Sequence, residues 1–233
     1  MCRRPRPLRL DDHARPNCFG KRISVVHQNC FTWFRTFAVA CCLAAGLVGC
    51  QSGGVNAVPG IDPDAVIVGL DDVRRITDRD DLTAQPVMDA PPSFQEHSRS
   101  PDQCRPVFGL EDAFGNNWSQ FRAVTYTAVG GEISTIATVA QGIGIYPSEG
   151  MARSEFERLI SSVDACAALH ARLYGFTLNR LDPSTVSLVF PENSQSVVYR
   201  LASSTLIDVV VQGIPRSDQI AETVTHMISE RLN

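Results

Sequence analysis

The amino-acid sequence predicts an α+β fold, in which helices lie on one face of a central antiparallel sheet. Two observations support this prediction. Apolar, β-branched runs follow one another at short spacing in the second half of the chain, as is typical of strands joined by hairpins. Two longer segments repeat their apolar residues at helical spacing, one from Ser148 to Leu173 and one that begins near Ser217.

A basic region and a short apolar run precede these elements. The apolar run covers residues 36–49, whereas a membrane-spanning helix needs about 20 such residues. A basic leader followed by a short apolar stretch is typical of a secretory signal peptide, so we assign residues 1–49 to one. The basic leader before Thr36 is long for this role. We therefore expect translation to begin downstream, at Val25 or Val26.

The end of the apolar run predicts lipidation. Residues 47–50, LVGC, resemble the bacterial lipobox, in which the signal peptide is cut before the cysteine and the thiol is lipidated. On this interpretation Cys50 carries acyl chains such as palmitate, and residues 50–65 form a flexible tether. The protein would then be exported and anchored to the outer face of the cell membrane. The alternative is an ordinary signal peptide, with Cys50 there by chance.

The charge of the remaining chain restricts its partners. From Cys50 onward there are 13 Arg, no Lys and 23 acidic residues, which gives a net charge of −10. Phosphate contacts require clustered cations, so this acidic body argues against nucleic-acid binding.

Cys104 and Cys166 predict a disulfide, because an even pair of cysteines in an exported protein is usually oxidised. In the chain-entropy model, closing a loop of about 60 residues stabilises a fold by roughly 4 kcal/mol. The alternative is a metal site, since Cys166 and His170 are four residues apart on an expected helix. A zinc site needs three or four ligands, and His97 and His226 show no ligand spacing. We predict no metal and no cofactor.

The first part of the domain, which we expect to span residues 66–233, predicts one helix and a long loop. Leu70–Ile76 has apolar residues at helical spacing and acids in its first turn. Residues 84–103 contain four prolines and many polar residues, which indicates a loop.

Two strands are expected next, from Trp118 to Val129 and from Ile133 to Tyr146, with a turn at residues 130–131. The second strand is expected to be interrupted at Gly142 and Gly144. These glycines do not form a phosphate-binding loop, because the pattern GIGIYPSEG lacks the remaining glycine spacing.

The long helix has two possible starts. Ser154 and Glu157 fit a capping box, and Ser148 follows a proline at an earlier position. Its apolar stripe places Cys166 on the inward side. The expected stripe is Phe156, Leu159, Ile160, Val163 and Ala167.

The last part of the chain predicts four strands and a helix. A hairpin turn is expected at residues 203–204, and Ser217 is expected to N-cap the final helix, with Asp218 in its first turn. The buried face of this helix is expected to be Ile220, Val224, Met227 and Ile228. The four strands are Phe176–Asn179, Thr185–Phe190, Ser196–Ala202 and Leu206–Gln212.

Several of these features together resemble the PknH-like extracellular sensor domain. They are the lipobox, the L-x-x-V-x-x-I helix, Trp118, the segment YPSEGMARSEFERLISSVDAC and the closing LIDVVVQG and SDQIAETVTHMISERL. This domain is the outer part of a mycobacterial receptor serine/threonine kinase and recurs in exported mycobacterial lipoproteins. The resemblance covers about residues 66–233. It implies a central antiparallel sheet with helices, a ligand cleft, and a disulfide between Cys104 and Cys166. A second family disulfide has no counterpart, because positions such as Tyr199 and Gln212 are not cysteines.

The resemblance implies a non-catalytic sensor or ligand-binding lipoprotein linked to kinase-type signalling. No kinase motif set is present, and neither G-x-S-x-G nor H-E-x-x-H occurs. The alternatives are a protein-interaction or structural lipoprotein without a small ligand, and a hydrolase of unrecognised type. The sequence does not identify ligand-binding residues. Trp118, Tyr126 and Tyr199 are candidates for the cleft, although buried packing is the commoner role of such residues.

Overall fold

The computed structural model describes residues 60–92, 100–130, 135–169, 175–191 and 194–233. The segment assigned to a signal peptide, most of the expected tether with Cys50, and the histidines His97 and His170 lie outside the described residues. Within the described part, no helix is both long and apolar enough to span a membrane.

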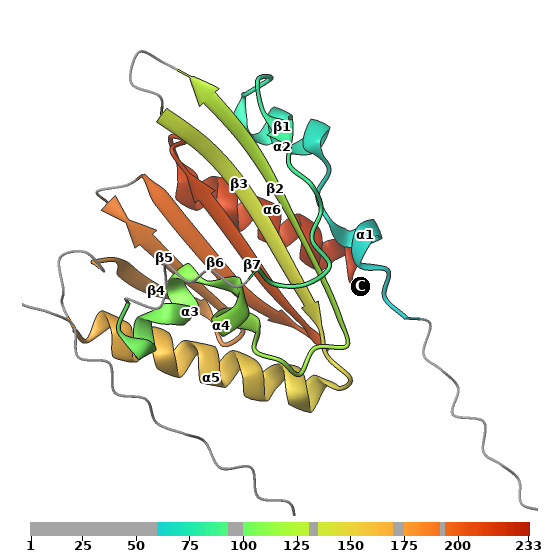
Figure 1. Cartoon of the computed structure of the whole chain (residues 1–233), viewed down its shortest axis with the longest axis vertical. Helices are drawn as coiled ribbons and strands as arrows, with labels where there is room; N and C mark the ends of the chain where they lie inside the picture. Colours follow the sequence, from blue (N-terminus) through green and yellow to red (C-terminus); the bar gives the residue numbers. More distant parts are fainter. Residues whose placement is uncertain (1–59, 93–99, 131–134, 170–174, 192–193) are drawn as a thin grey trace, which may run out of the picture. The chain divides into compact units, whose positions relative to one another are not determined.

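Seven strands form one antiparallel sheet in the order β1-β2-β3-β7-β6-β5-β4 (Figure 1). The central strand β7 pairs with β3 on one side and β6 on the other. The strands are β1 Thr83–Ala84, β2 Gln120–Gly130, β3 Thr135–Ile145, β4 Thr177–Asp182, β5 Thr185–Phe190, β6 Gln195–Ala202 and β7 Thr205–Gln212. The predicted α+β class and the hairpin between the last two strands are confirmed.

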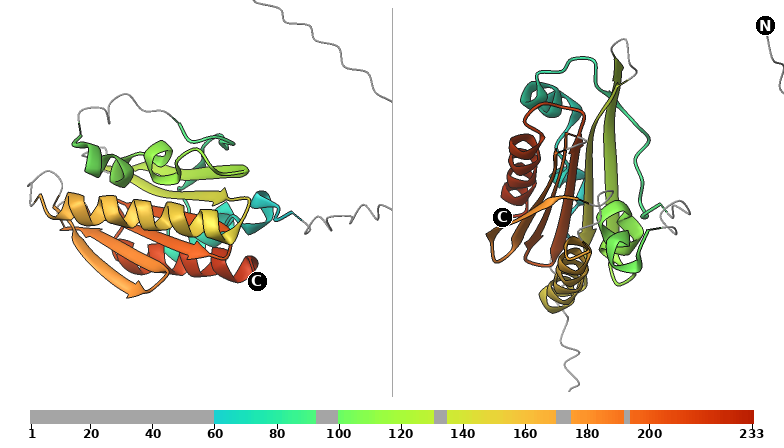
Figure 2. Two further views of the ribbon diagram at one scale, coloured as in Figure 1. Left: turned by 90° about the horizontal axis from the view of Figure 1, so that it is seen from below. Right: turned by 90° about the vertical axis from the view of Figure 1, so that its left-hand side faces the viewer.

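Helices cover both faces of the sheet, so the expectation of a single covered face was wrong. In the edge-on view of Figure 2, α6 lies on the opposite side of the strands from α3 and α4. The reason is that β7 is apolar on both sides: Leu206 packs in the core beneath α5, whereas Ile207 packs in the core beneath α6. The helices are α1 Pro63–Val66, α2 Leu70–Thr77, α3 Arg105–Phe108, α4 Leu110–Phe114, α5 Glu149–Ala167, α6 Ser217–Arg231 and the 3₁₀ helix η2 Asp102–Cys104.

Two predicted helix starts are corrected. The Ser148 hydroxyl caps α5 by accepting a hydrogen bond from the Met151 N–H at 3.3 Å, so the alternative start at Ser154 was wrong. The helix ends at Ala167, earlier than predicted. Ser217 is the first residue of α6 and does not cap it, because its hydroxyl is bonded to that of Ser196 at 2.9 Å.

The disulfide is confirmed. Cys104 and Cys166 are bonded at 2.02 Å, with Cα atoms 4.9 Å apart, and both residues are buried. The bond joins the end of η2 to the inward side of α5, which excludes the alternative in which Cys166 and His170 hold a metal.

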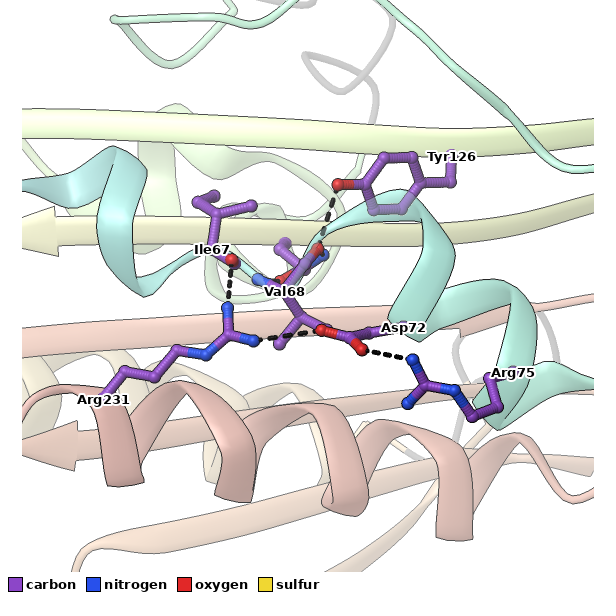
Figure 3. Close-up of polar contacts among 7 residues, drawn as sticks. Ile67, Val68, Asp72, Arg75, Tyr126 and Arg231 are labelled. Carbon is purple, nitrogen blue, oxygen red and sulfur yellow. Dashed lines mark hydrogen bonds and ion pairs between the residues drawn. The ribbon is translucent and has the colours of Figure 1, made fainter.

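The N-terminal part of the domain is fastened to the sheet around Val68 (Figure 3). The buried Gln141 side chain accepts from the Val68 N–H and donates to its carbonyl, both at 2.9 Å. The Tyr126 hydroxyl donates to the same carbonyl at 2.9 Å. Arg231, at the end of α6, pairs with Asp72 of α2 at 3.1 Å and also donates to the carbonyl of residue 67. Tyr126 is therefore a structural residue.

Strand β3 runs without interruption through Gly142 and Gly144, contrary to the sequence-based expectation. The glycines instead make room for the ring of Phe114. A Cβ at Gly142 would lie 3.1 Å from this ring, and a Cβ at Gly144 would lie 2.6 Å from it. Helix α4 can therefore lie close to the backbone of the sheet.

We expect Gly144→Ala to destabilise the fold by about 1–3 kcal/mol, because the added methyl overlaps the fully buried Phe114 ring. Chemical denaturation monitored by circular dichroism measures this change. The matched control is Gly150→Ala, an exposed position in α5 whose nearest neighbour would be 3.9 Å away. That variant should be unchanged or more stable, since Ala favours a helix. Equal stability of the two variants would contradict the prediction.

Candidate functional site

Residues 102–114, called here the covering segment, comprise η2, α3 and α4 and lie over the sheet beside α5 (Figure 1). The sequence analysis predicted no helix between Cys104 and Trp118. The disulfide attaches the start of this segment to α5. Arg158 of α5 attaches its end by donating to the carbonyl of Asp112 at 2.6 Å. The covering segment is thus held at both ends by one helix.

Two buried tyrosines fasten the same segment to the sheet. The Tyr199 hydroxyl donates to the carbonyl of Pro106 at 3.1 Å. The Tyr146 hydroxyl donates to the carbonyl of Phe114 at 2.7 Å. Both hydroxyls are therefore used in positioning the segment, and neither donates to a group inside a cavity.

Two adjoining cavities lie between the covering segment and the sheet, each with a volume of about 130 Å³. They share Leu110, Asp208 and Val210 in their linings. The first is completed by Pro106, Val107, Phe108, Gly109 and Gln195. The second is completed by Ala123, Thr125, Ala140, Gln141 and Gly142. The second cavity is the more apolar one, since small and aliphatic groups form most of its wall.

Asp208 is the one ionisable residue in the linings of these two cavities. It lies at the middle of β7, between Gly142 of β3 and Tyr199 of β6, and only 4% of it is exposed. Its Oδ1 atom is buried and has no hydrogen-bond partner. Buried polar groups are nearly always satisfied, so an unpaired carboxylate oxygen beside a cavity calls for an explanation.

Removal from water raises the pKa of Asp208 to about 7, because the charged carboxylate is poorly solvated where it lies. The carboxylate in turn adds to the effect of burial in raising the pKa of Tyr199. Near neutral pH, small changes in the surroundings of Asp208 therefore decide whether it carries a charge.

With this geometry in view, two comparisons with known proteins are informative. The family model of PknH-like extracellular domains matches residues 58–231 of the chain. The chain belongs to this family. Membership in a family of extracellular domains implies that the protein is exported.

The crystal structure of the extracellular domain of PknH from Mycobacterium tuberculosis has a similar fold. It superposes with a TM-score of 0.57 at 12% sequence identity, over 73% of this chain and 94% of that chain. At this identity the likeness shows a shared fold alone. Among curated proteins, none matches the chain.

The aromatic residues expected from the sequence lie outside the cavity linings of this PknH-like domain. Tyr126 and Tyr199 are buried and bonded to backbone carbonyls. Trp118 is partly buried, donates to the carbonyl of Gly115 at 3.0 Å and packs on Phe121. All three therefore have packing roles.

The described residues around the cavities show no grouping typical of catalysis or metal binding. The two cavity linings contain no histidine, cysteine, lysine or second carboxylate beside Asp208. In the described ranges, no group of three or more His, Cys, Asp or Glu residues is arranged to hold a metal ion. Two pairs of adjacent acids, Asp71–Asp72 and Asp80–Asp81, lie at the surface, where Asp72 and Asp81 pair with nearby arginines.

The sequence analysis missed Asp208, although one signal was present. The residue interrupts the apolar run LIDVVVQ, which was correctly predicted as a strand. A charged residue in the middle of a strand is ordinary at a sheet edge but costly at its centre. The sequence analysis did not predict the order of the strands, so it did not show that Asp208 lies at the centre of the sheet.

We expect the stability of the domain to fall as pH rises from 4 to 8, in part because of Asp208. Between its ordinary value of 3.8 and a pKa of about 7, the folded chain keeps a proton on Asp208 that the unfolded chain has released. The free energy of unfolding therefore falls as pH rises through this range, by up to roughly 4 kcal/mol.

The variant Asp208→Asn lacks this titration, so it should gain stability relative to the wild type between pH 4 and pH 8. Urea denaturation at both pH values measures the gain. Asp80→Asn, at an exposed acid, is the matched control and should show no such gain. Parallel pH profiles of the wild type and Asp208→Asn would contradict the expectation.

Proposed function

We propose that the protein is a cell-envelope lipoprotein whose PknH-like domain binds a small ligand and serves as a non-catalytic sensor. The observation that carries this proposal is the pair of cavities under the covering segment, with the unsatisfied Asp208 in both walls. Ligand sites in proteins are typically apolar hollows with a few placed polar groups, and this site has that composition.

The covering segment supports a sensing role. It forms one wall of the first cavity and is joined by a disulfide and hydrogen bonds to α5, β6 and the end of β3. A ligand that contacts Leu110 and Asp208 at once would change the contacts between this segment and the sheet. Since the family resemblance extends to receptor kinases, we propose a link to kinase-type signalling for this chain as well.

The proposed anchor is Cys50, lipidated after removal of residues 1–49. The domain would then begin at residue 66, after a tether over residues 50–65. The acidic body supplies little attraction to an anionic membrane, so membrane attachment rests on the acyl chains.

A second candidate function is protein interaction, and it is favoured by the tip of the β2–β3 hairpin. Val129 and Ile136 are cross-strand partners there, and they are 70% and 56% exposed. They lie beyond Thr138, where the pairing of β3 with β7 ends. An exposed apolar pair is small for an interface, and so we place this candidate second.

We expect Cys50→Ser to move the protein from the membrane fraction to the soluble fraction of the envelope, because the thiol that would carry the lipid is lost. Cell fractionation with immunoblotting, and intact-mass measurement of the wild type, check this. Cys42→Ser is the matched control and should leave the protein in the membrane fraction. An unmodified wild-type mass would contradict the proposed anchor.

The ligand-binding proposal predicts a co-purifying small molecule. Native mass spectrometry of the chain recovered from its own envelope should show an added mass that disappears on denaturation. Ala140→Phe, which fills the second cavity, should reduce the occupancy at least tenfold. Exposed Val129→Phe is the control and should retain it. If the mass is always that of the bare chain, including after incubation with envelope extracts, the protein-interaction function is the better account.

A further inference from the structure

We propose that the ligand carries a cationic amine, which pairs with the Asp208 carboxylate while an apolar portion of the ligand fills the adjoining cavity. This inference rests on the proposed function and names the chemical class that the site would select. It is supported by the unpaired carboxylate, the charges around it, and the shape and lining of the cavities.

The carboxylate has no compensating cation among the described residues. The arginines that flank the covering segment pair elsewhere: Arg105 with Asp102 at 2.9 Å, and Arg158 with Glu155. Arg200, on the next strand, pairs with Asp182 at 3.7 Å and lines a different cavity against α6. A buried charge without a partner is costly, and a cationic ligand would supply the missing one.

No donor among the described residues is bonded to Asp208 Oδ1. The hydroxyl of Tyr199, the cross-strand partner of Asp208, donates instead to the backbone of Pro106. An ammonium group has three donors and a positive charge, so it satisfies both needs at once. A neutral alcohol would satisfy only the hydrogen bond, and an anionic ligand would place two like charges together.

The rest of the lining is suited to an apolar body. Leu110, Ala123, Ala140 and Val210 contribute aliphatic groups, and the second cavity measures about 130 Å³. An apolar cavity of about 150 Å³ holds a benzene ring. A single ring or a short alkyl chain bearing an amine therefore matches this space. The net charge of −10 after Cys50 would favour the approach of cations over anions.

The pairing would couple binding to pH. With a pKa of about 7, the ionised fraction of Asp208 grows about tenfold between pH 6 and pH 8. Tyr199 is the one other titratable residue that faces it from β6, while the facing positions on β3 and α4 are Gly142 and Leu110. The affinity for an amine that stays protonated over this pH range should rise, whereas the affinity for a neutral analogue should not.

The test compares benzylamine with benzyl alcohol, two probes of similar shape, by isothermal titration calorimetry on the full chain. We expect benzylamine to bind about tenfold more tightly at pH 8 than at pH 6. Asp208→Asn should weaken benzylamine binding at pH 8 at least tenfold and leave benzyl alcohol unchanged. Asp80→Asn is the charge-matched control at the surface and should bind both probes as the wild type does.

The outcomes separate the inference from the proposed function. If benzyl alcohol binds as tightly as benzylamine at pH 8, and Ala140→Phe blocks both, the cavity binds ligands but the amine preference is wrong. If Asp208→Asn binds benzylamine at pH 8 as tightly as the wild type does, the amine does not pair with Asp208 and the inference is overturned. If neither probe binds and the native mass is always that of the bare chain, the proposed ligand-binding function itself fails.

Discussion

The attachment of the covering segment by the Cys104–Cys166 disulfide is the constraint on which the site depends. The segment is short, and its two helices are too brief to be stable alone. The disulfide joins it to a long, well-buried helix, and Phe114 enters the space left by two glycines of β3. Without these attachments only the hydrogen bonds from Tyr199, Tyr146 and Arg158 would hold the segment that places Leu110 beside Asp208.

The second constraint is the burial of Asp208 at the centre of the sheet. A buried and unsatisfied polar group typically costs about 1–3 kcal/mol, which is a large part of the stability of a small domain. On the α6 side of the sheet, by contrast, the buried hydroxyls of Ser196 and Ser217 are hydrogen-bonded to each other. Asp208 is left unpaired beside two cavities instead. The proposed ligand would complete the contacts of this carboxylate.

The two faces of the sheet differ in their polar contacts and cavities. On the α6 side, Val68 is fastened by Gln141 and Tyr126 in a network that leaves no comparable unpaired carboxylate in the described ranges (Figure 3). This side joins the domain to the segment that leads toward Cys50. On the other side, the covering segment leaves space against the strands. The contacts that fasten Val68 and the cavities beside Asp208 thus lie mainly on opposite faces of one sheet, and Gln141 of β3 takes part in both.

The sequence by itself determined the local elements: the helix at Leu70, the closing hairpin, the stripe of α5 and the cysteine pair all follow from periodicity and residue type. It failed where a distant contact decides. Gly142 and Gly144 break a strand in isolation, yet here the ring of Phe114 occupies the space that their missing side chains leave. Helices on both faces, and Asp208 at the sheet centre, follow only from the strand order. Periodicity records which side chains share a face, but tertiary structure alone decides what that face meets.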